Sequence, residues 1–358
     1  MTFLIGILVN DRIKAGKQAV NELYNVGYYG RPKGDTLELT LIEAAYLHYK
    51  KKLEIHMDDR SLSFKEFFTE ASKRQQYFDI KYIVYKDLRE RGFYVQPSVT
   101  DFRVYPRGGH PGKTPAKFFV HVISERIPLS LRELRMSLEA AHNVHKTMVL
   151  AIVDEESDIT FYEIGKVEPA GDMRPLEESL QDISGSSTFL EDRVVVWDSD
   201  ISHSLHAEGF YGQPLDADRL QLSLVESGYL LKKGVLEVAD MSGTSSALAF
   251  DDFAAKASVI ESEFMLKYMV YENLRDRGLV PKTGFKFGSH FRVYQNFKSV
   301  DKLPHSEYLV HSIAEDYEFT LPVMSRAVRL ANSVRKRMIY AVHDNVHCAY
   351  IDIGRIKM

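Results

Sequence analysis

Tyr294, His305 and Lys336 carry side chains that suit proton transfer and charge stabilisation at a phosphodiester. Histidine titrates near neutral pH, and lysine supplies a compact cation for a phosphate. Tyrosine is a weaker base, because its unperturbed pKa is about 10, but a nearby cation lowers that pKa by stabilising the phenolate. Attack of an RNA 2′-OH on its own phosphate needs a base, an acid and a cation, and it needs no metal ion. The three residues therefore suit RNA cleavage if the fold brings them together.

The sequence repeats itself after about 180 residues, so one fold is expected twice. KYIVYKDLRERG (81–92) matches KYMVYENLRDRG (267–278), with identity at eight of twelve positions. Other matches, at offsets of 182 to 190 residues, pair GYYGRP (27–32) with GFYGQP (209–214), and DFRVY (101–105) with HFRVY (290–294). We therefore expect a tandem duplication that covers nearly the whole chain.

A residue present in only one copy is a better functional candidate than one present in both. His305 is such a residue, because the first copy has Pro115 at the matching position. His311 instead matches His121, which favours a structural role for that pair. Tyr294 and Lys336 do have counterparts in the first copy, Tyr105 and Lys146. Two explanations remain open: these residues have a packing role in both copies, or the first copy contains an active site that has decayed.

Each copy is expected to have a small mixed α/β N-terminal lobe followed by a second lobe of strands and flanking helices, a mixed α/β (α+β) fold. Apolar residues of 264–277 fall largely on one helical face, and Gly278 ends that helix. Further helices are predicted at 41–49, 222–231 and 321–337, and strands at 291–294, 308–313, 338–342 and 348–353. The predicted boundaries are 1–75 and 76–168 for the first copy, 169–192 for an acidic linker, and 193–256 and 257–358 for the second copy.

The composition is that of a soluble protein, with 358 residues, 45% hydrophobic and 27% charged. No apolar run approaches the ~20 residues of a membrane helix, and MTFLIGILVN at the start is expected to be a first strand. Cys348 is the only cysteine, which excludes an internal disulfide and a cysteine-based zinc site and favours a cytoplasmic location. Charge is segregated, with a net of +6 over 264–358 and −11 over 154–200.

These motifs together resemble the archaeal tRNA-splicing endonucleases, in the form that joins an inactive and an active repeat in one chain. The resemblance runs nearly end to end and rests on KTGFKFGSHFRVY (282–294), LPHSEYLVH (303–311) and VRLANSVRKRM (328–338). It implies a restriction-endonuclease-like second lobe in each repeat and excision of introns from precursor tRNA at a bulge-helix-bulge. It also implies that the reaction uses no cofactor and no metal ion.

The resemblance assigns a role to each residue of the candidate triad. Tyr294 would be the general base on the 2′-OH, His305 the general acid, and Lys336 the group that stabilises the pentacovalent transition state. The expected products carry a 2′,3′-cyclic phosphate and a 5′-hydroxyl, and Pro115 predicts that the first repeat is inactive. Flipped bulge bases would stack on Arg329 and Arg355, and phosphate contacts are expected from Lys282, Lys286, Arg335 and Arg337.

An acidic loop lies between two predicted strands of the first copy, and it contains Asp154, Glu155, Glu156 and Asp158. The resemblance implies that this loop docks into a basic pocket on a neighbouring repeat. We therefore expect a homodimer, with the loop as a contact between chains. The apolar strands predicted at 159–164 and 350–354 would pair the two repeats within one chain.

Two other functions remain open. One is a non-catalytic RNA-binding or structural subunit of a splicing endonuclease, against which His305 argues because a scaffold does not need it. The other is a metal-dependent nuclease, which activity in EDTA would exclude. A metabolic enzyme fits poorly, because the sequence lacks G-x-G-x-x-G, a P-loop and G-x-S-x-G.

Overall fold

The computed structural model describes residues 4–173, 185–241, 247–302, 304–344 and 347–358. The chain divides into two compact units. Unit 1 comprises Met1–Gly165, Glu318–Met324 and Arg355–Met358, and unit 2 comprises Lys166–Tyr317 and Ser325–Gly354. Unit 1 holds the first copy with two short segments of the second, and unit 2 holds the rest of the second copy. Each copy has the same two lobes, so the expected duplication is confirmed. Every helix in the described part of the chain is too short or too polar to cross a membrane.

The first lobe of each unit is a mixed sheet with helices against it. Its elements in unit 1 are β1 (Leu4–Val9), β2 (Arg12–Ala15), α1 (Lys17–Ala19), the π-helix η1 (Val20–Tyr24), α2 (Asn25–Gly27), β3 (Arg31–Lys33), β4 (Thr36–Thr40), α3 (Leu41–Tyr49), β5 (Leu53–Met57), β6 (Arg60–Leu62) and α4 (Phe64–Arg74). In unit 2 they are β13 (Gly185–Phe189), β14 (Val194–Val196), α7 (Ser199–Ala207), β15 (Gln213–Pro214), β16 (Leu220–Leu222), α8 (Leu224–Lys232), β17 (Leu236–Asp240) and α9 (Phe250–Ile260). The strand orders are β3-β4-β2-β1-β5-β6 and β15-β16-β14-β13-β17. β1 and β13 occupy matching places, because each is antiparallel to the next strand and parallel to β5 or β17.

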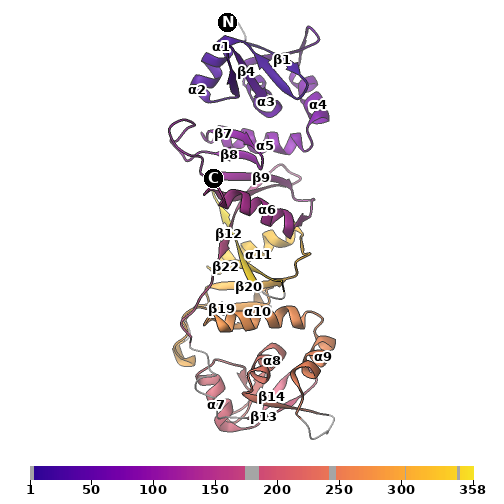
Figure 1. The fold of residues 1–358 in the computed structure, drawn as a ribbon, viewed down its shortest axis with the longest axis vertical. Helices are drawn as coiled ribbons and strands as arrows, with labels where there is room; N and C mark the ends of the chain where they lie inside the picture. Colours follow the sequence, from indigo (N-terminus) through magenta and orange to yellow (C-terminus); the bar gives the residue numbers. More distant parts are fainter. Residues whose placement is uncertain (1–3, 174–184, 242–246, 303, 345–346) are drawn as a thin grey trace. The chain divides into compact units, whose positions relative to one another are not determined.

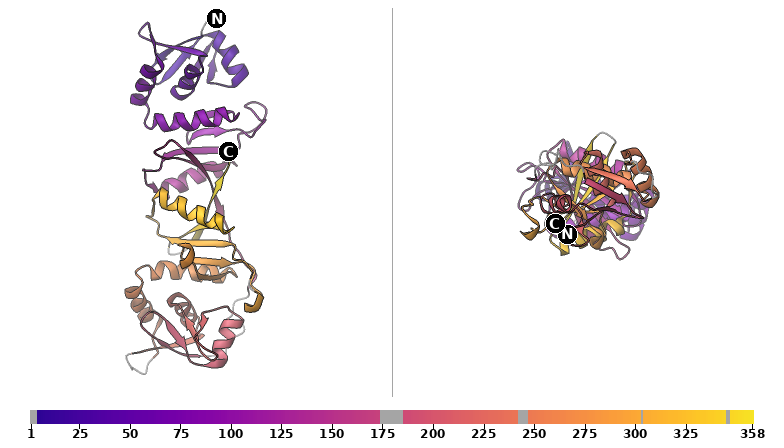
Figure 2. Two further views of the ribbon diagram at one scale, coloured as in Figure 1. Left: turned by 180° about the vertical axis from the view of Figure 1, so that it is seen from behind. Right: turned by 90° about the horizontal axis from the view of Figure 1, so that it is seen from below.

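The second lobe of each unit also contains a sheet. Its elements in the first copy are α5 (Phe78–Glu90), β7 (Val95–Ser98), β8 (Asp101–Val104), β9 (Phe118–Ser124), β10 (Leu129–Ser130), α6 (Leu131–His142), β11 (Thr147–Val153) and β12 (Ile159–Val167). In the second copy they are α10 (Phe264–Asp276), β18 (Val280–Thr283), the 3-10 turns η3 (Phe285–Phe287) and η4 (Val300–Lys302), β19 (Phe291–Tyr294), β20 (Tyr308–Ile313), β21 (Glu318–Phe319), α11 (Leu321–Ser333), β22 (Arg337–His343) and β23 (Cys348–Ile356). The matching strand orders are β7-β8-β9-β11-β12 and β18-β19-β20-β22-β23. In Figure 1, and from behind in the left view of Figure 2, α10 lies between this sheet of unit 2 and the first lobe of the same unit.

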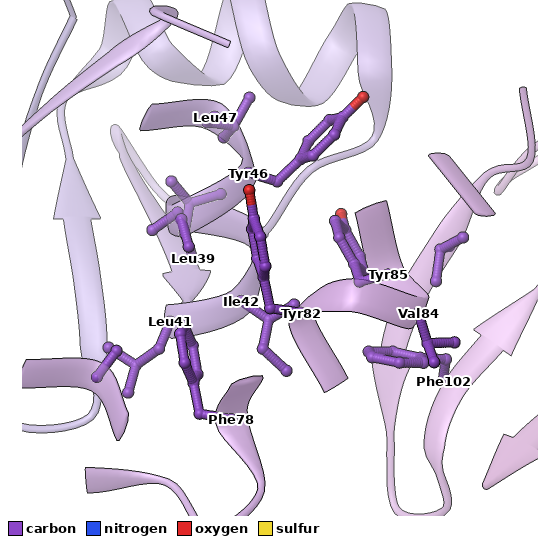
Figure 3. Close-up of a cluster of buried hydrophobic side chains, with 14 of the residues drawn as sticks. Leu39, Leu41, Ile42, Tyr46, Leu47, Phe78, Tyr82, Val84, Tyr85 and Phe102 are labelled. Atoms are coloured by element: carbon purple, nitrogen blue, oxygen red, sulfur yellow. The ribbon is translucent and has the colours of Figure 1, made fainter. Parts of the chain in front are cut away.

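One hydrophobic core joins the two lobes within each unit. In unit 1, side chains from α3, α5 and β8 meet, among them Ile42, Tyr46, Phe78, Tyr82, Tyr85 and Phe102 (Figure 3). In unit 2, the Tyr271 ring of α10 lies 5.7 Å from that of Tyr229 on α8 and 5.9 Å from that of Phe291 on β19. Because this core is shared, the first lobe can hold side chains of the second lobe in place.

Four helices begin with a Ser or Thr followed three residues later by Glu, the sequence signature of a capping box. In each of them the hydroxyl accepts from the glutamate N–H and the carboxylate accepts from the capping residue; the pairs are Thr40–Glu43, Ser63–Glu66, Ser130–Glu133 and Ser223–Glu226. Glu43 and Glu226 occupy matching positions at the starts of α3 and α8, and both are buried. Each also accepts from a glycine N–H of the GYYG or GFYG turn, Gly30 or Gly212.

Two predicted boundaries are corrected by the structure. The expected linker at 169–192 already contains β13, because Gly185–Phe189 pairs with β14 and β17. The helix expected over 321–337 ends at Ser333. Arg335 there has a left-handed backbone with φ of 57°, and the Lys336 N–H bonds back to the Ala331 carbonyl, which ends the helix. Lys336 therefore lies outside the helix and directly before β22.

Candidate active site

The sheet of unit 2 brings the ends of three strands to one edge. β20 and β22 are parallel, with Tyr308 opposite Arg337, so both begin at this edge. β19 is antiparallel to β20, so it ends there. Tyr294 is the last residue of β19, Lys336 directly precedes β22, and His305 lies three residues before β20.

Tyr294 is held by aromatic packing. Its ring is 5.8 Å from that of Phe210 in an edge-to-face contact, and only 5% of the residue is exposed. The Arg292 guanidinium lies 5.8 Å from the Tyr294 ring centroid. Within the described part of the chain, no protein group hydrogen-bonds the Tyr294 hydroxyl. The hydroxyl is therefore available to a substrate.

Lys336 is tied to the segment that carries His305. Its ammonium donates to the Ser306 carbonyl at 2.6 Å. Burial lowers the pKa of Lys336, Glu307 opposes this shift, and Arg292 adds to it. Lys336 and Arg292 together make this edge of the sheet positive, which suits a phosphate.

His305 is exposed, although the two residues that follow it are firmly anchored. Ser306 is buried, and Glu307 bonds through its backbone to Val293 on one side and Arg337 on the other. The Glu307 carboxylate also accepts from the Gln295 N–H at 2.8 Å. His305 thus presents an accessible imidazole from a fixed backbone.

The first repeat has the same topology but different chemistry at this edge. β8, β9 and β11 bring Tyr105, Pro115 and Lys146 to matching positions, because Phe118 pairs with Thr147 as Tyr308 pairs with Arg337. Pro115 provides no acid, and the Tyr105 hydroxyl donates to the Gln96 side chain at 2.8 Å. Burial also raises the pKa of Tyr105, which disfavours a phenolate.

The predicted RNA-contacting residues divide into exposed and engaged groups. Arg329 on α11, Arg335 and Lys286 on η3 are exposed. Arg337 is exposed too, but it forms an ion pair with Asp352 at 2.5 Å. Arg355, near the end of β23, is exposed and belongs to unit 1.

Lys282 is unsuited to the phosphate contact expected of it. Its ammonium donates to the carbonyls of Phe210 and Gly212 and pairs with Glu226 at 2.8 Å, and its side chain is 10% exposed. Burial by itself raises the pKa of Glu226, but the adjacent Lys282 ammonium outweighs it and holds that pKa well below its ordinary value. Lys282 is therefore left out of the RNA surface proposed below.

The structure adds two residues that the sequence comparison passed over. Arg292 lies near Tyr294 and Lys336, but it matches Arg103 of the first copy and so showed no asymmetry. Phe285 is 87% exposed on η3, and the neighbouring Phe287 ring lies 6.0 Å from the Lys336 ammonium. The sequence does carry a signal for this turn. Matching residues of the two copies are 186 positions apart at Lys282 and 189 apart at Phe291, so the second copy has three extra residues between them.

The acidic loop of the first repeat is shaped by its own first residue. The Asp154 carboxylate accepts from the N–H groups of Glu156 and Asp158 at 3.0 and 2.9 Å. Glu155 pairs with Arg126. The side chains of Glu156 and Asp158 are exposed, so this ordered turn presents negative charge to solvent.

No group of three or more His, Cys, Asp or Glu side chains in the described ranges is arranged to hold a metal ion. The candidate active site consists of Tyr294, His305 and Lys336, with Arg292 and Glu307 beside them. Such a set can take a proton, give a proton and stabilise negative charge at a phosphate.

Comparison with known proteins agrees with the duplicated organisation. A family model described as tRNA intron endonuclease, catalytic C-terminal domain, matches residues 78–161 and again 264–350. The model of the N-terminal domain of the same family matches residues 4–68 and 185–253. The matched ranges repeat the two lobes in order, first in one copy and then in the other.

Several archaeal proteins named tRNA-splicing endonuclease are similar over nearly their whole length. The protein of Methanosarcina mazei is 58% identical over 358 residues, which cover 100% of both chains. That of Methanococcoides burtonii is 61% identical over 351 residues, covering 98% of this chain and 99% of the relative. That of Halobacterium salinarum is 39% identical over 359 residues, covering 95% of each.

Proposed function

The chain belongs to the tRNA-splicing endonuclease family, whose members excise introns from tRNA, and on that premise we propose how it cuts. It cleaves precursor tRNA at a bulge-helix-bulge and leaves 2′,3′-cyclic phosphate and 5′-hydroxyl ends. The observation that carries the proposal is the asymmetry of the two sheet edges. Only the second repeat adds His305 to the tyrosine and lysine that both repeats have.

The reaction needs three events at one phosphate. Tyr294 takes the proton of the 2′-OH, and the resulting oxygen attacks the adjacent phosphorus. Lys336, with Arg292 near it, stabilises the negative charge that builds up on the phosphate oxygens. His305 gives its proton to the 5′-oxygen as the bond between that oxygen and phosphorus breaks. The 2′- and 3′-oxygens remain bonded to phosphorus as the cyclic phosphate, so no water molecule takes part. The proposed reaction also uses no metal ion.

The test of this function is cleavage of an end-labelled RNA carrying a bulge-helix-bulge, with EDTA present. Cuts within the bulges and 2′,3′-cyclic phosphate ends in EDTA are expected. Replacing the ribose at the cleavage site by 2′-deoxyribose should block the cut, because the nucleophile is missing. Binding without cleavage would favour the non-catalytic subunit, and loss of activity in EDTA would favour the metal-dependent nuclease.

Exposed basic residues support an RNA surface. Arg329 and Arg355 remain the proposed base contacts, and Lys286, Arg335 and Arg337 remain the proposed phosphate contacts. To these we add Phe285, whose exposed ring offers a face on which a base can stack; it lies on the same turn as Phe287, whose ring is 6.0 Å from the Lys336 ammonium.

Phe285→Ala is expected to raise KM by about tenfold or more, because stacking of one base on an aromatic ring contributes roughly 1–3 kcal/mol. Phe285→Trp should keep KM close to the wild-type value. Cleavage assays over a range of RNA concentrations measure both. An unchanged KM in the alanine variant would remove Phe285 from the RNA surface, and the same assay tests Arg329→Ala and Arg355→Ala.

A homodimer held by the acidic loop is the proposed assembly, with a cytoplasmic location. The ordered turn at 154–158 presents two exposed carboxylates, on Glu156 and Asp158, which suit a basic partner surface. The double variant Glu156→Lys with Asp158→Lys should therefore be monomeric in sedimentation, where wild type is dimeric. Glu22→Lys with Glu139→Lys, an equal charge change elsewhere on the first repeat, is the control and should remain dimeric. A dimer that survives the first pair would exclude the loop as the contact.

A further inference from the structure

Position 282 in the second repeat corresponds to position 96 in the first. Both pair across two antiparallel strands with the arginine of the FRVY motif, Gln96 with Arg103 and Lys282 with Arg292. The motif's tyrosine lies two residues after that arginine, on the same face of the sheet. The side chain at this position is therefore a close neighbour of the tyrosine in either repeat.

In the first repeat this neighbour binds the tyrosine. The Tyr105 hydroxyl donates to the Gln96 side-chain oxygen at 2.8 Å. A hydroxyl held in this way has its proton committed to a protein acceptor. The hydroxyl of Tyr105 is therefore already hydrogen-bonded within the protein.

In the second repeat the neighbour binds groups other than the tyrosine. The Lys282 ammonium has three donors, and it meets the Phe210 carbonyl at 3.0 Å, the Gly212 carbonyl at 2.9 Å and Glu226 Oε1 at 2.8 Å. All three acceptors belong to the first lobe. The Tyr294 hydroxyl has no hydrogen bond to a protein group among the described residues, and Phe210 packs against its ring.

We propose that Lys282 is a positioning residue that keeps the Tyr294 hydroxyl free for the 2′-OH, because Glu226 and the GFYG turn engage all three donors of its ammonium. This inference rests on the proposed function of Tyr294. It assigns a role to the first lobe, which supplies the acceptors and so keeps the tyrosine of the second lobe reactive. It also gives a reason, besides Pro115, for the inactivity of the first repeat.

Lys282→Gln is the critical variant, because it recreates the pair found in the first repeat. The first repeat accommodates a buried glutamate, Glu43, with glutamine at the matching position, so the combination is compatible with the fold. Lys282→Met is the matched control. It removes the same ion pair but offers no acceptor to Tyr294. Each variant is also made with Glu226→Gln, which removes the unpaired carboxylate charge.

Single-turnover cleavage of the bulge-helix-bulge RNA is measured for these variants with Tyr294 and with Tyr294→Phe. With Tyr294 present, the glutamine variants should be slower than the methionine variants by about tenfold, the effect of one hydrogen bond. With Tyr294→Phe the difference should disappear, because no hydroxyl remains to be held. RNA affinity should not differ between the glutamine and methionine variants.

Three results overturn the inference. If Tyr294→Phe slows cleavage but the glutamine and methionine variants have equal rates, the proposed base stands and only the role of Lys282 fails. If Tyr294→Phe cleaves at the wild-type rate, the proposed base fails and the inference fails with it. A difference between the variants that persists with Tyr294→Phe also overturns it, since Lys282 would then act through another group.

Discussion

His305→Ala is expected to slow cleavage by about 10²–10⁴-fold, the usual effect of losing a general acid. The leaving 5′-oxygen would then depart without its proton, while RNA binding should change little. Because His305 is exposed and lies outside the strands, the variant should unfold at the wild-type temperature. Single-turnover rates, RNA affinity and thermal unfolding measure the three quantities.

The first repeat provides the matched control for this experiment. Pro115→Ala changes the corresponding position and should leave the rate unchanged. Imidazole added to the buffer should partly restore His305→Ala, since the vacated position is open to solvent. If His305→Ala cleaves at the wild-type rate, His305 is not the general acid and is only a surface residue.

Lys336→Met is expected to lower kcat by about 10²–10³-fold, similar to the loss of one donor that stabilises a transition-state oxyanion. Two effects contribute. The cation at the phosphate is lost, and so is the bond from the ammonium to the Ser306 carbonyl, which holds the segment carrying His305. Lys146→Met makes the same change in the first repeat and should leave kcat unchanged. Equal rates for wild type and Lys336→Met would exclude the lysine from catalysis.

The pH dependence of kcat provides a second test of Lys336. Burial lowers the pKa of this lysine, so its charge is lost at a lower pH than that of an exposed lysine. The wild-type rate should therefore fall on the alkaline side below the usual titration range of lysine. Lys336→Arg retains its charge to higher pH, and any activity it keeps should persist there. An identical alkaline fall in both proteins would assign it to another group.

Much of the fold could be predicted because the sequence contains two copies of the same pattern. β19 and β20 begin and end where the strands were expected, and their places follow from the match of each copy to the other. The duplication also singled out His305, because a proline stands opposite it. The strand pairing that brings the three residues to one edge required the structure, since a sequence repeat does not give register.

Lys282 and Phe285 show where sequence reasoning was weakest. Lys282 was expected at the RNA because it is basic and close to the motifs, but its partners lie in the first lobe, 56 to 72 residues away along the chain. Contacts of that range depend on how two lobes share a core. Phe285 would ordinarily be assigned to the interior, and its exposure in a turn that the first copy lacks identifies it as a surface residue.

The contacts around Tyr105 bear on how the two halves diverged after the ancestral gene was duplicated. Pro115 leaves that half without the proposed acid, so a reactive tyrosine there has no partner for the proposed reaction. Gln96 binds the Tyr105 hydroxyl, and Lys117 stands where the other half has Glu307. Replacing Pro115 alone by histidine would place an imidazole in that half. The Tyr105 hydroxyl would still be bound by Gln96, and Lys117 would still carry a charge opposite to that of Glu307. Restoring the proposed site in that half would therefore take more than one substitution, so a single mutation should not make the first repeat active.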